Sequence, residues 1–228
     1  MSKTALITGI SSGIGQAIKQ KLEQSGWKVV GISRHLPLQS IGYEADLSQL
    51  EFVEPVSTRA GEEHGPFDAF IHVAGVWHDE NAVLAGKKLH EFSTKEIVKT
   101  MNVGITSAMV MSARLMPFMS PDSAMIYISG AFEDGGANWL PYYTSKRALE
   151  DFIVGLASDE EAIRVFGVSP GNTATESLKK FYPDSYASAQ PPEIVASTCV
   201  DLIEGKLSSS SGMIVEVKNS SIGLGYHK

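Results

Sequence analysis

The sequence contains few of the features that would place it outside the ordinary globular proteins. It has one cysteine among 228 residues, Cys199, so no internal disulfide can form, and we expect a reducing, cytoplasmic setting. No apolar run reaches the roughly 20 residues that a membrane-spanning helix needs. The net charge of −7 argues against nucleic acids and acidic membrane surfaces as partners, because both bind basic surfaces.

The composition is that of a folded domain. Hydrophobic residues make up 43% of the chain and charged residues 20%, which is typical of globular proteins. The length predicts a single domain over residues 1–228, long enough to bury a substantial core. Residues 1–4 lead directly into a strand-like segment, so we expect no signal peptide.

Strand-like and helix-like segments alternate along the chain. One predicted strand ends at Thr8, and a weaker one ends near Asp46. Five more cover 28–32, 68–73, 123–128, 163–168 and 213–217. Helical patterns follow the first strand and occupy roughly 93–119, 142–157 and 192–204. The apolar residues of the strands are nearly continuous, which is typical of parallel strands covered on both faces. The chain is therefore predicted to form one doubly wound α/β sheet, with ligands beyond the carboxyl ends of its strands.

A glycine-rich turn connects the first strand to the first helix, with the sequence Thr8-Gly9-Ile10-Ser11-Ser12-Gly13-Ile14-Gly15. Gly9 permits the turn, Gly13 lets a pyrophosphate approach the backbone, and Gly15 allows the helix to pack closely on the strand. Free backbone N–H groups and the helix dipole favour an anion there. A turn without a ligand is the alternative, but the order of strand, glycines and helix favours a dinucleotide.

A set of polar side chains lies at fixed separations further along the chain. Tyr142 and Lys146 are four residues apart at the start of a helix opened by Pro141, so they share one face. A nearby ammonium and a helix N-terminus are expected to lower the pKa of the tyrosine from its usual value near 10. Ser129 ends a predicted strand thirteen residues before Tyr142, and Asn102 lies forty before it. Ordinary helix packing could produce the Tyr/Lys pair alone, but not the whole set.

The glycine turn and these separations together resemble the short-chain dehydrogenase/reductase family. The resemblance implies a Rossmann-type domain and an NAD(P)-dependent oxidoreductase that transfers a hydride between nicotinamide and a carbonyl or alcohol of a small organic substrate. It implies that Ser129 polarises the carbonyl and that Tyr142 transfers the proton. Lys146 would hold the nicotinamide ribose and tune Tyr142, and Asn102 would support a water relay for protons.

Two further segments agree with the family. Residues 170–175 resemble its Pro-Gly segment beside the nicotinamide, where Thr173 would offer backbone contacts and Thr175 a hydroxyl. At 72–75, a histidine and a valine replace two asparagines of the family pattern, which puts their usual hydrogen bonds in doubt. The expected cofactor-binding residues are Gly9, Ser11, Ser12, Gly13, Ile14, Gly15, Ser33, Arg34, Asp46, Leu47, Ala74, Gly75, Tyr142, Lys146, Pro170, Gly171, Thr173 and Thr175.

The end of the second strand predicts a preference for NADP(H) over NAD(H). Proteins specific for NAD place an acidic residue about 20 positions after the glycines, where it holds the ribose hydroxyls. This chain has Ser33 and Arg34 at that place, and Arg34 lies nineteen residues beyond Gly15. The arginine can form an ion pair with a 2′-phosphate. If Arg34 is merely a surface residue, a mixed or NAD preference is expected instead.

The remaining candidates are less specific. His64, His72, His78 and His90 lack the spacing of metal ligands, and no metal is expected. The methionine-rich 93–119 segment and the 142–157 helix predict a homodimer or homotetramer, because these segments form subunit interfaces in the family.

The substrate pocket is expected among Trp77, 132–139 and 176–190, where the pair Glu133-Asp134 mildly disfavours an anionic substrate. No motif there identifies the substrate. Two other readings remain open: a nucleotide-sensing protein without activity, and an epimerase or dehydratase acting through transient oxidation.

Overall fold

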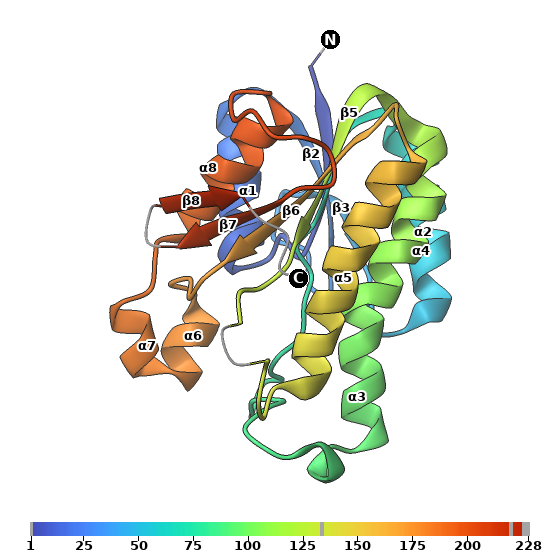
Figure 1. Cartoon of the computed structure of the whole chain (residues 1–228). Helices are drawn as coiled ribbons and strands as arrows, with labels where there is room; N and C mark the ends of the chain where they lie inside the picture. Colours follow the sequence, from blue (N-terminus) through green and yellow to red (C-terminus); the bar gives the residue numbers. More distant parts are fainter. Residues whose placement is uncertain (1, 133–134, 219–220, 225–228) are drawn as a thin grey trace.

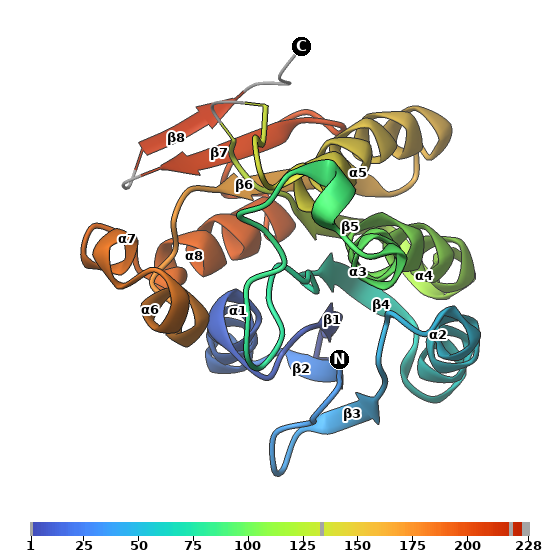
Figure 2. The same cartoon turned by 90° about the horizontal axis from the view of Figure 1, so that it is seen from below.

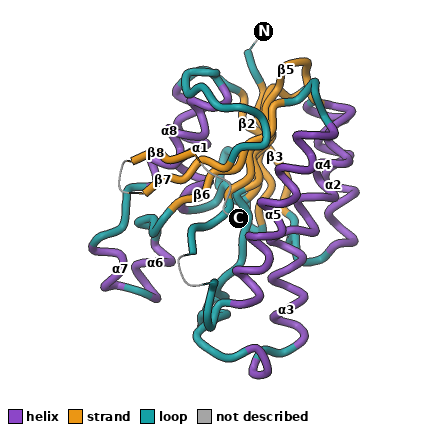
Figure 3. The backbone as a smooth tube through the Cα atoms, in the orientation of Figure 1, coloured by secondary structure: helices purple, strands orange, loops and turns teal. Residues whose placement is uncertain are grey.

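The computed structural model describes residues 2–132, 135–218 and 221–224, and it forms a single sheet between two layers of helices (Figure 1). The pair Glu133-Asp134 lies outside the described residues. Figure 3 shows the strands running through the middle of the molecule with helices on either side. Among the described residues, no helix is long and apolar enough to cross a bilayer.

The described strands form a sheet of eight in the order β3-β2-β1-β4-β5-β6-β7-β8. The strands are β1 (Thr4–Thr8), β2 (Lys28–Ser33), β3 (Ile41–Glu44), β4 (Phe67–His72), β5 (Met119–Ile128), β6 (Arg164–Pro170), β7 (Ile214–Lys218) and β8 (Ser221–Leu224). The predicted doubly wound parallel sheet is confirmed for β1 to β7. The last strand, β8, pairs antiparallel with β7 and was not predicted.

The helices cover both faces of the sheet. They are α1 (Gly13–Gln24), α2 (Leu50–His64), α3 (Thr94–Met101), α4 (Ser107–Leu115), α5 (Leu140–Asp159), α6 (Glu176–Phe181), α7 (Pro183–Ala187) and α8 (Pro192–Ile203). Short 3₁₀ turns lie at Leu89–Glu91 and Met116–Phe118. Seen from below, α1 and α8 cover one face, whereas α2, α4 and α5 cover the other (Figure 2).

Two hydrophobic clusters fill the space between the sheet and these layers. One packs Ile18 and Leu22 of α1 with Cys199 of α8, and the other packs Met111 of α4 with Leu149 of α5. All five side chains are fully buried. Because strand residues alternate between the two clusters, every strand of the sheet centre is apolar on both faces, as the near-continuous apolar runs predicted.

The prediction of one continuous helix over 93–119 is wrong. The segment divides into α3, a π-helical turn at Asn102–Thr106 and α4, and residues from Met119 onward already belong to β5. The π turn is closed by the Ser107 N–H, which donates to the Asn102 carbonyl. Such single π turns are frequent at functional sites. This one presents Gly104 to α5, where a Cβ would come within 2.5 Å of the Ser145 hydroxyl.

His72 connects β1, β4 and the π turn at the carboxyl edge of the sheet. The Thr8 hydroxyl accepts hydrogen bonds from the N–H groups of Val73 and Ala74, both at 3.0 Å. Its own proton is therefore available to His72 Nδ1 at 3.3 Å, and His72 Nε2–H donates to the Val103 carbonyl at 3.3 Å. The histidine thus supplies side-chain hydrogen bonds at a position where their presence was in doubt.

The buried His72 predicts a loss of stability in acid. Burial, together with the positive charge of Lys146, lowers its pKa to about 3 from the model-peptide value of 6.5. Between these values the unfolded chain binds a proton at this residue and the folded chain does not. Its contribution to stability is therefore complete above pH 6.5 and declines as the pH falls toward 3, by roughly 2 kcal/mol at pH 5.

Urea unfolding at pH 7.5 and pH 5 tests this prediction against the variant His72→Asn, which cannot titrate. The wild type should lose roughly 2 kcal/mol more stability between the two pH values than the variant does. Because all other titrating groups are common to both proteins, equal losses would show that His72 is protonated in the folded state.

Candidate functional site

The glycine turn has the close packing that its sequence predicted. Gly9 and Gly13 adopt positive φ values of 73° and 54°, which residues with side chains rarely adopt. A Cβ at Gly15 would overlap the carbonyl oxygen of Gly9. The turn therefore brings the start of α1 directly against the end of β1, at the carboxyl edge of the sheet.

A cavity of about 750 Å³ begins at this turn and extends along the carboxyl edge of the sheet. Most of the residues expected from the sequence line it, although they come from every part of the chain. They are Gly9, Ser11, Ser12, Gly13, Ile14, Ser33, Arg34, Asp46, Leu47, Ala74, Gly75, Ser129, Tyr142, Lys146, Pro170, Gly171, Thr173 and Thr175. Two expected site residues, Gly15 and Asn102, are not among its lining residues.

Tyr142 and Lys146 lie together in this cavity, in the first two turns of α5. The ammonium of Lys146 is 5.5 Å from the centroid of the Tyr142 ring and donates to the Ile128 carbonyl at 2.7 Å. Pro141 occupies the first turn of the helix, as predicted. The lysine is 2% exposed, so the charge is held in place at the end of β5.

Burial determines the proton affinities of this pair. Burial raises the pKa of Tyr142 to about 12, which is opposite to the lowering that the sequence predicted. Burial removes the phenolate from water, and this loss of solvation raises the pKa. Burial also lowers the pKa of Lys146 to about 8, while the carboxylate of Glu150 acts in the opposite direction. At neutral pH Tyr142 is therefore a protonated phenol, which suits a proton donor.

Ser129 follows β5 at the same edge, but its hydroxyl is already engaged. It donates to the carboxylate of Glu150, which is buried on α5 and also paired with Arg147. A side chain at the next position, Gly130, would point in a different direction. A Cβ there would lie 3.4 Å from the Phe132 ring and 3.9 Å from Cγ of Lys146. The side-chain direction at position 130 thus faces Phe132 and the stem of Lys146. Glu150 was missed from the sequence, because acidic residues on helices are usually solvated.

Asn102 has a positioning role in the described structure. Its side-chain amide donates to the Ser48 carbonyl at 2.9 Å, and the Ser48 N–H donates to the carboxylate of Asp46 at 2.9 Å. These bonds fix the turn that carries Asp46 and Leu47 to the wall of the cavity. The start of the π turn is thereby connected to the segment after β3.

The cavity fits a dinucleotide on two observations. Gly75 lies beside the Tyr142/Lys146 pair, where a Cβ would be 3.4 Å from the Lys146 ammonium, so glycine keeps the lysine accessible from the cavity. At the other end, the Ser33 hydroxyl donates to the Ser11 hydroxyl at 2.9 Å, which brings the end of β2 to the glycine turn. Arg34, next along the chain, is exposed and lines the cavity.

The 170–175 segment closes the cavity opposite the glycine turn. A Cβ on Gly13 would come within 2.9 Å of the Thr175 methyl group, so the two segments pack directly on each other. The Thr175 hydroxyl accepts from the Leu178 N–H at 3.3 Å and caps α6, and the Thr173 hydroxyl donates to the Gly171 carbonyl at 3.0 Å. Thr175 was expected to offer its hydroxyl to a cofactor, and here that hydroxyl caps a helix.

Comparison with known proteins agrees with this geometry. A family model described as short chain dehydrogenase matches residues 3–185. The 2-dehydro-3-deoxy-D-gluconate 5-dehydrogenase of Escherichia coli is 28% identical over 205 residues, covering 82% of this chain and 78% of its own. The NADPH-dependent pterin aldehyde reductase of Arabidopsis thaliana is 26% identical over 227 residues, covering 92% and 91%.

Solved structures share the fold. A short chain dehydrogenase from Shigella flexneri, solved in complex with NADP, superposes with a TM-score of 0.82. It is 20% identical and covers 94% of this chain and 96% of its own. At this level of identity the likeness concerns the fold alone.

The buried bond from Ser129 to Glu150 predicts an effect on stability. Ser129→Ala leaves a buried carboxylate without one of its donors and should lower the free energy of unfolding by about 1–3 kcal/mol. Ser123, on β5 just before it, is the matched control: it is also buried, and its hydroxyl has no hydrogen-bond partner among the described residues. Ser123→Ala should leave stability unchanged or raise it, and denaturant unfolding of both variants decides. Equal effects would mean that the Ser129 hydroxyl does not hold Glu150.

Proposed function

The chain belongs to the short-chain dehydrogenase family and is an NAD(P)-dependent oxidoreductase, and on this premise we propose that it reduces a carbonyl of a small organic substrate with NADPH. The observation that carries the proposal is the placement of Tyr142 and Lys146 in the same cavity as the glycine turn. A phosphate-binding turn and a proton donor in one cavity are what transfer of a hydride and a proton requires.

In this proposal, residues of the chain supply the proton and hold the cofactor in position. When bound at this site, a nicotinamide supplies the hydride. Tyr142, protonated at neutral pH, donates its proton to the carbonyl oxygen as the alcohol forms. Lys146 would hold the ribose hydroxyls from the position that Gly75 leaves open, and its charge stabilises the phenolate left on Tyr142. A pKa of about 12 keeps the phenol protonated at pH 7, which is the form that donates a proton in the reductive direction.

Ser129 and Asn102 enter the proposal with restricted roles. Ser129 can polarise a carbonyl only by exchanging its hydrogen bond with Glu150 for one with the substrate. Asn102 would support proton delivery through the π turn, while its side chain holds the Ser48 carbonyl. The proposal therefore depends first on Tyr142 and Lys146.

The preference for NADP(H) is part of the proposal. Arg34 lies on the cavity at the end of β2, beside the hydroxyl pair of Ser33 and Ser11. An arginine and two hydroxyls suit a 2′-phosphate, which a carboxylate at this place would repel. The names of the plant pterin aldehyde reductase and the bacterial NADP complex support the same choice. An NAD-preferring dehydrogenase is the second candidate, and it is favoured if Arg34 is only solvated.

We also propose that the chain forms a homodimer or homotetramer. Val98 on α3 and Met109 on α4 are each 48% exposed, although both are large apolar side chains. Met111, in contrast, is fully buried in the core. The exposed pair lies on helices that the sequence predicted to form a subunit interface, and burial of such side chains would favour association.

The Tyr142→Phe variant should keep the fold and the affinity for NADPH but lose turnover by roughly 10²–10⁴-fold, because the ring remains and only the proton donor is removed. Tyr143→Phe is the matched control, since Tyr143 points about 100° around the helix and cannot replace its neighbour. Steady-state kinetics and NADPH fluorescence titrations measure both effects. An inactive Tyr143→Phe beside an active Tyr142→Phe would contradict the assignment.

The Arg34→Ala variant should weaken NADP(H) binding by about tenfold to a hundredfold, the loss of one charge-assisted phosphate contact, with little effect on NAD(H). The comparison is kcat/KM for both cofactors in the wild type and the variant. Arg114→Ala serves as the control, because Arg114 is an exposed arginine paired with Glu54 and does not line the cavity. Equal losses for both cofactors would mean that Arg34 does not recognise the phosphate.

A further inference from the structure

Beyond Tyr142, the cavity is bounded by three aromatic rings that the proposed reaction does not use. Trp77, Trp139 and Tyr182 all line the cavity. Their ring centroids are 6.0 Å apart for the two tryptophans, 5.9 Å for Trp139 and Tyr182, and 6.1 Å for Trp77 and Tyr182. Each ring therefore contacts the other two. We call these three residues the aromatic wall.

The aromatic wall is continuous with the catalytic tyrosine. The Trp139 and Tyr142 rings are 6.1 Å apart in an edge-to-face arrangement, and Phe132 meets Tyr142 from another direction at 5.9 Å. A substrate whose carbonyl reaches the Tyr142 hydroxyl would therefore extend along the wall. The three wall residues come from the segment after β4, the start of α5 and the junction of α6 and α7, which meet at the carboxyl edge of the sheet (Figure 2).

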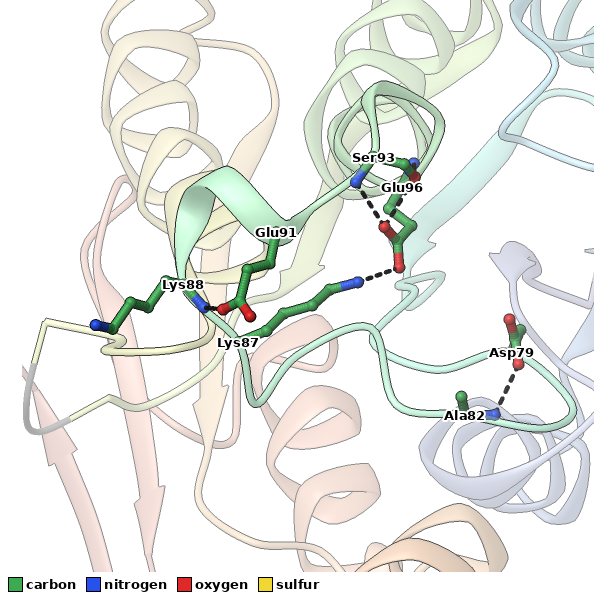
Figure 4. A network of polar contacts seen from close by, with 7 residues as sticks. All are labelled: Asp79, Ala82, Lys87, Lys88, Glu91, Ser93 and Glu96. Carbon is green, nitrogen blue, oxygen red and sulfur yellow. Dashed lines mark hydrogen bonds and ion pairs between the residues drawn. The ribbon is translucent and has the colours of Figure 1, made fainter.

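The segment that carries Trp77 is held by its own hydrogen bonds. The Leu84 N–H donates to the Trp77 carbonyl at 2.8 Å, and the Asp79 carboxylate accepts from the Asn81 and Ala82 N–H groups, both at 2.8 Å. Figure 4 shows the Asp79–Ala82 bond of this turn. The wall is thus prearranged, and a ligand need not order it.

The following residues attach this segment to α3. Lys87 donates to Glu96 in the first turn of α3 at 2.6 Å, and Glu96 also accepts from the Ser93 N–H at 2.8 Å (Figure 4). Nearer the wall, the Lys180 ammonium at the end of α6 donates to the Glu80 carbonyl at 2.6 Å. Phe181 packs on Trp77 at 6.0 Å. The wall is therefore supported from both sides.

The wall and the lining residues beside it in the chain contribute no charged side chain to the cavity among the described residues. Among the described lining residues, the charged side chains are Arg34, Asp46, Lys99 and Lys146. The described lining residues that belong to the wall or stand beside it in the chain carry no Asp, Glu, Lys or Arg, and they are Trp77, His78, Gly136, Ala137, Trp139, Ser177, Leu178, Tyr182 and Ser185. A carboxylate or phosphate on the substrate would find no opposite charge on the wall residues themselves, and a polyol would find few polar partners among them.

On the basis of the proposed function, we propose that the substrate is an uncharged planar aromatic ketone or aldehyde whose ring packs against the aromatic wall. Its carbonyl carbon takes the hydride from the reduced nicotinamide, and its oxygen takes the Tyr142 proton, so that the C=O group becomes a secondary or primary alcohol. Aromatic rings attract one another in edge-to-face and offset geometries beyond what their buried area provides. The wall therefore favours an aryl group over a saturated ring of similar size.

Two ketones of matched size test the proposal: acetophenone and cyclohexyl methyl ketone. The aryl ketone is the less electrophilic of the two because its carbonyl is conjugated, so a preference for it reflects binding. The wild type should show a kcat/KM with NADPH that is about tenfold higher for acetophenone. Equal values, or a preference for the saturated ring, would overturn the proposal.

The variant Tyr182→Leu tests whether the aromatic wall causes the preference for the aryl ketone. It keeps an apolar side chain but removes one ring, and should reduce the aryl preference about fivefold, mainly through KM. Tyr186→Leu is the control, because Tyr186 lies on α7 next to Tyr182's helix junction, contacts Lys179 and does not line the cavity. An unchanged preference in Tyr182→Leu, or the same reduction in both variants, would contradict the role of the wall.

Binding without turnover separates this proposal from the proposed function. Saturable changes in tryptophan fluorescence with NADP⁺ present should give a Kd about fivefold lower for acetophenone than for cyclohexyl methyl ketone. The signal would come from Trp77 and Trp139, since Trp27 is buried in the core cluster beside α1. Aryl binding without reduction of either ketone would overturn the proposed function alone. Reduction of both ketones without an aryl preference in binding or turnover would overturn the wall proposal alone.

Discussion

The site depends on the three hydrogen bonds of the Thr8 hydroxyl, at the place where β1 and β4 end. By accepting from two N–H groups after β4 and donating to His72, this one side chain sets the path of the chain toward Gly75. His72 passes the constraint on to the Val103 carbonyl in the π turn. The π turn in turn packs on Ser145, within the helix that carries Tyr142 and Lys146. The glycine turn and the Tyr142/Lys146 pair are thus held relative to each other by polar contacts at the edge of the sheet, which are costly to break.

Burial then determines what the two ends of the cavity can do. At the Tyr142 end it raises the pKa of Tyr142 and lowers that of Lys146, which leaves a neutral phenol beside a lysine whose positive charge Glu150 favours. The end at the glycine turn is built on the ends of strands, beside Arg34. The other end is built from loops and short helices that carry aromatic rings. A shared scaffold with a variable wall is how one fold serves many substrates.

The fold could be predicted where local pattern and burial agree. The central strands are apolar on both faces, so their continuous apolar runs identified a parallel sheet directly. Helix α2 gave no such signal, because it contains Pro55 and buries Ser57, Ala60 and Gly61, which form no apolar stripe. The 93–119 segment carried a helical pattern throughout, yet the extra residue of the π turn and the sheet register at Met119 divide it. Packing against other elements decided both cases.

The sequence by itself determined the residues of the phosphate turn and the spacing of Tyr142 and Lys146, because glycine geometry and the helical period are local properties. Only the tertiary structure decided which way Ser129 points, since its partner Glu150 lies across on α5. Desolvation by the whole fold also reversed the expected pKa shift of Tyr142. The aromatic wall came from the fold as well: Trp77, Trp139 and Tyr182 are far apart in the chain, and no local pattern relates residues that meet only when the sheet brings their loops to one edge.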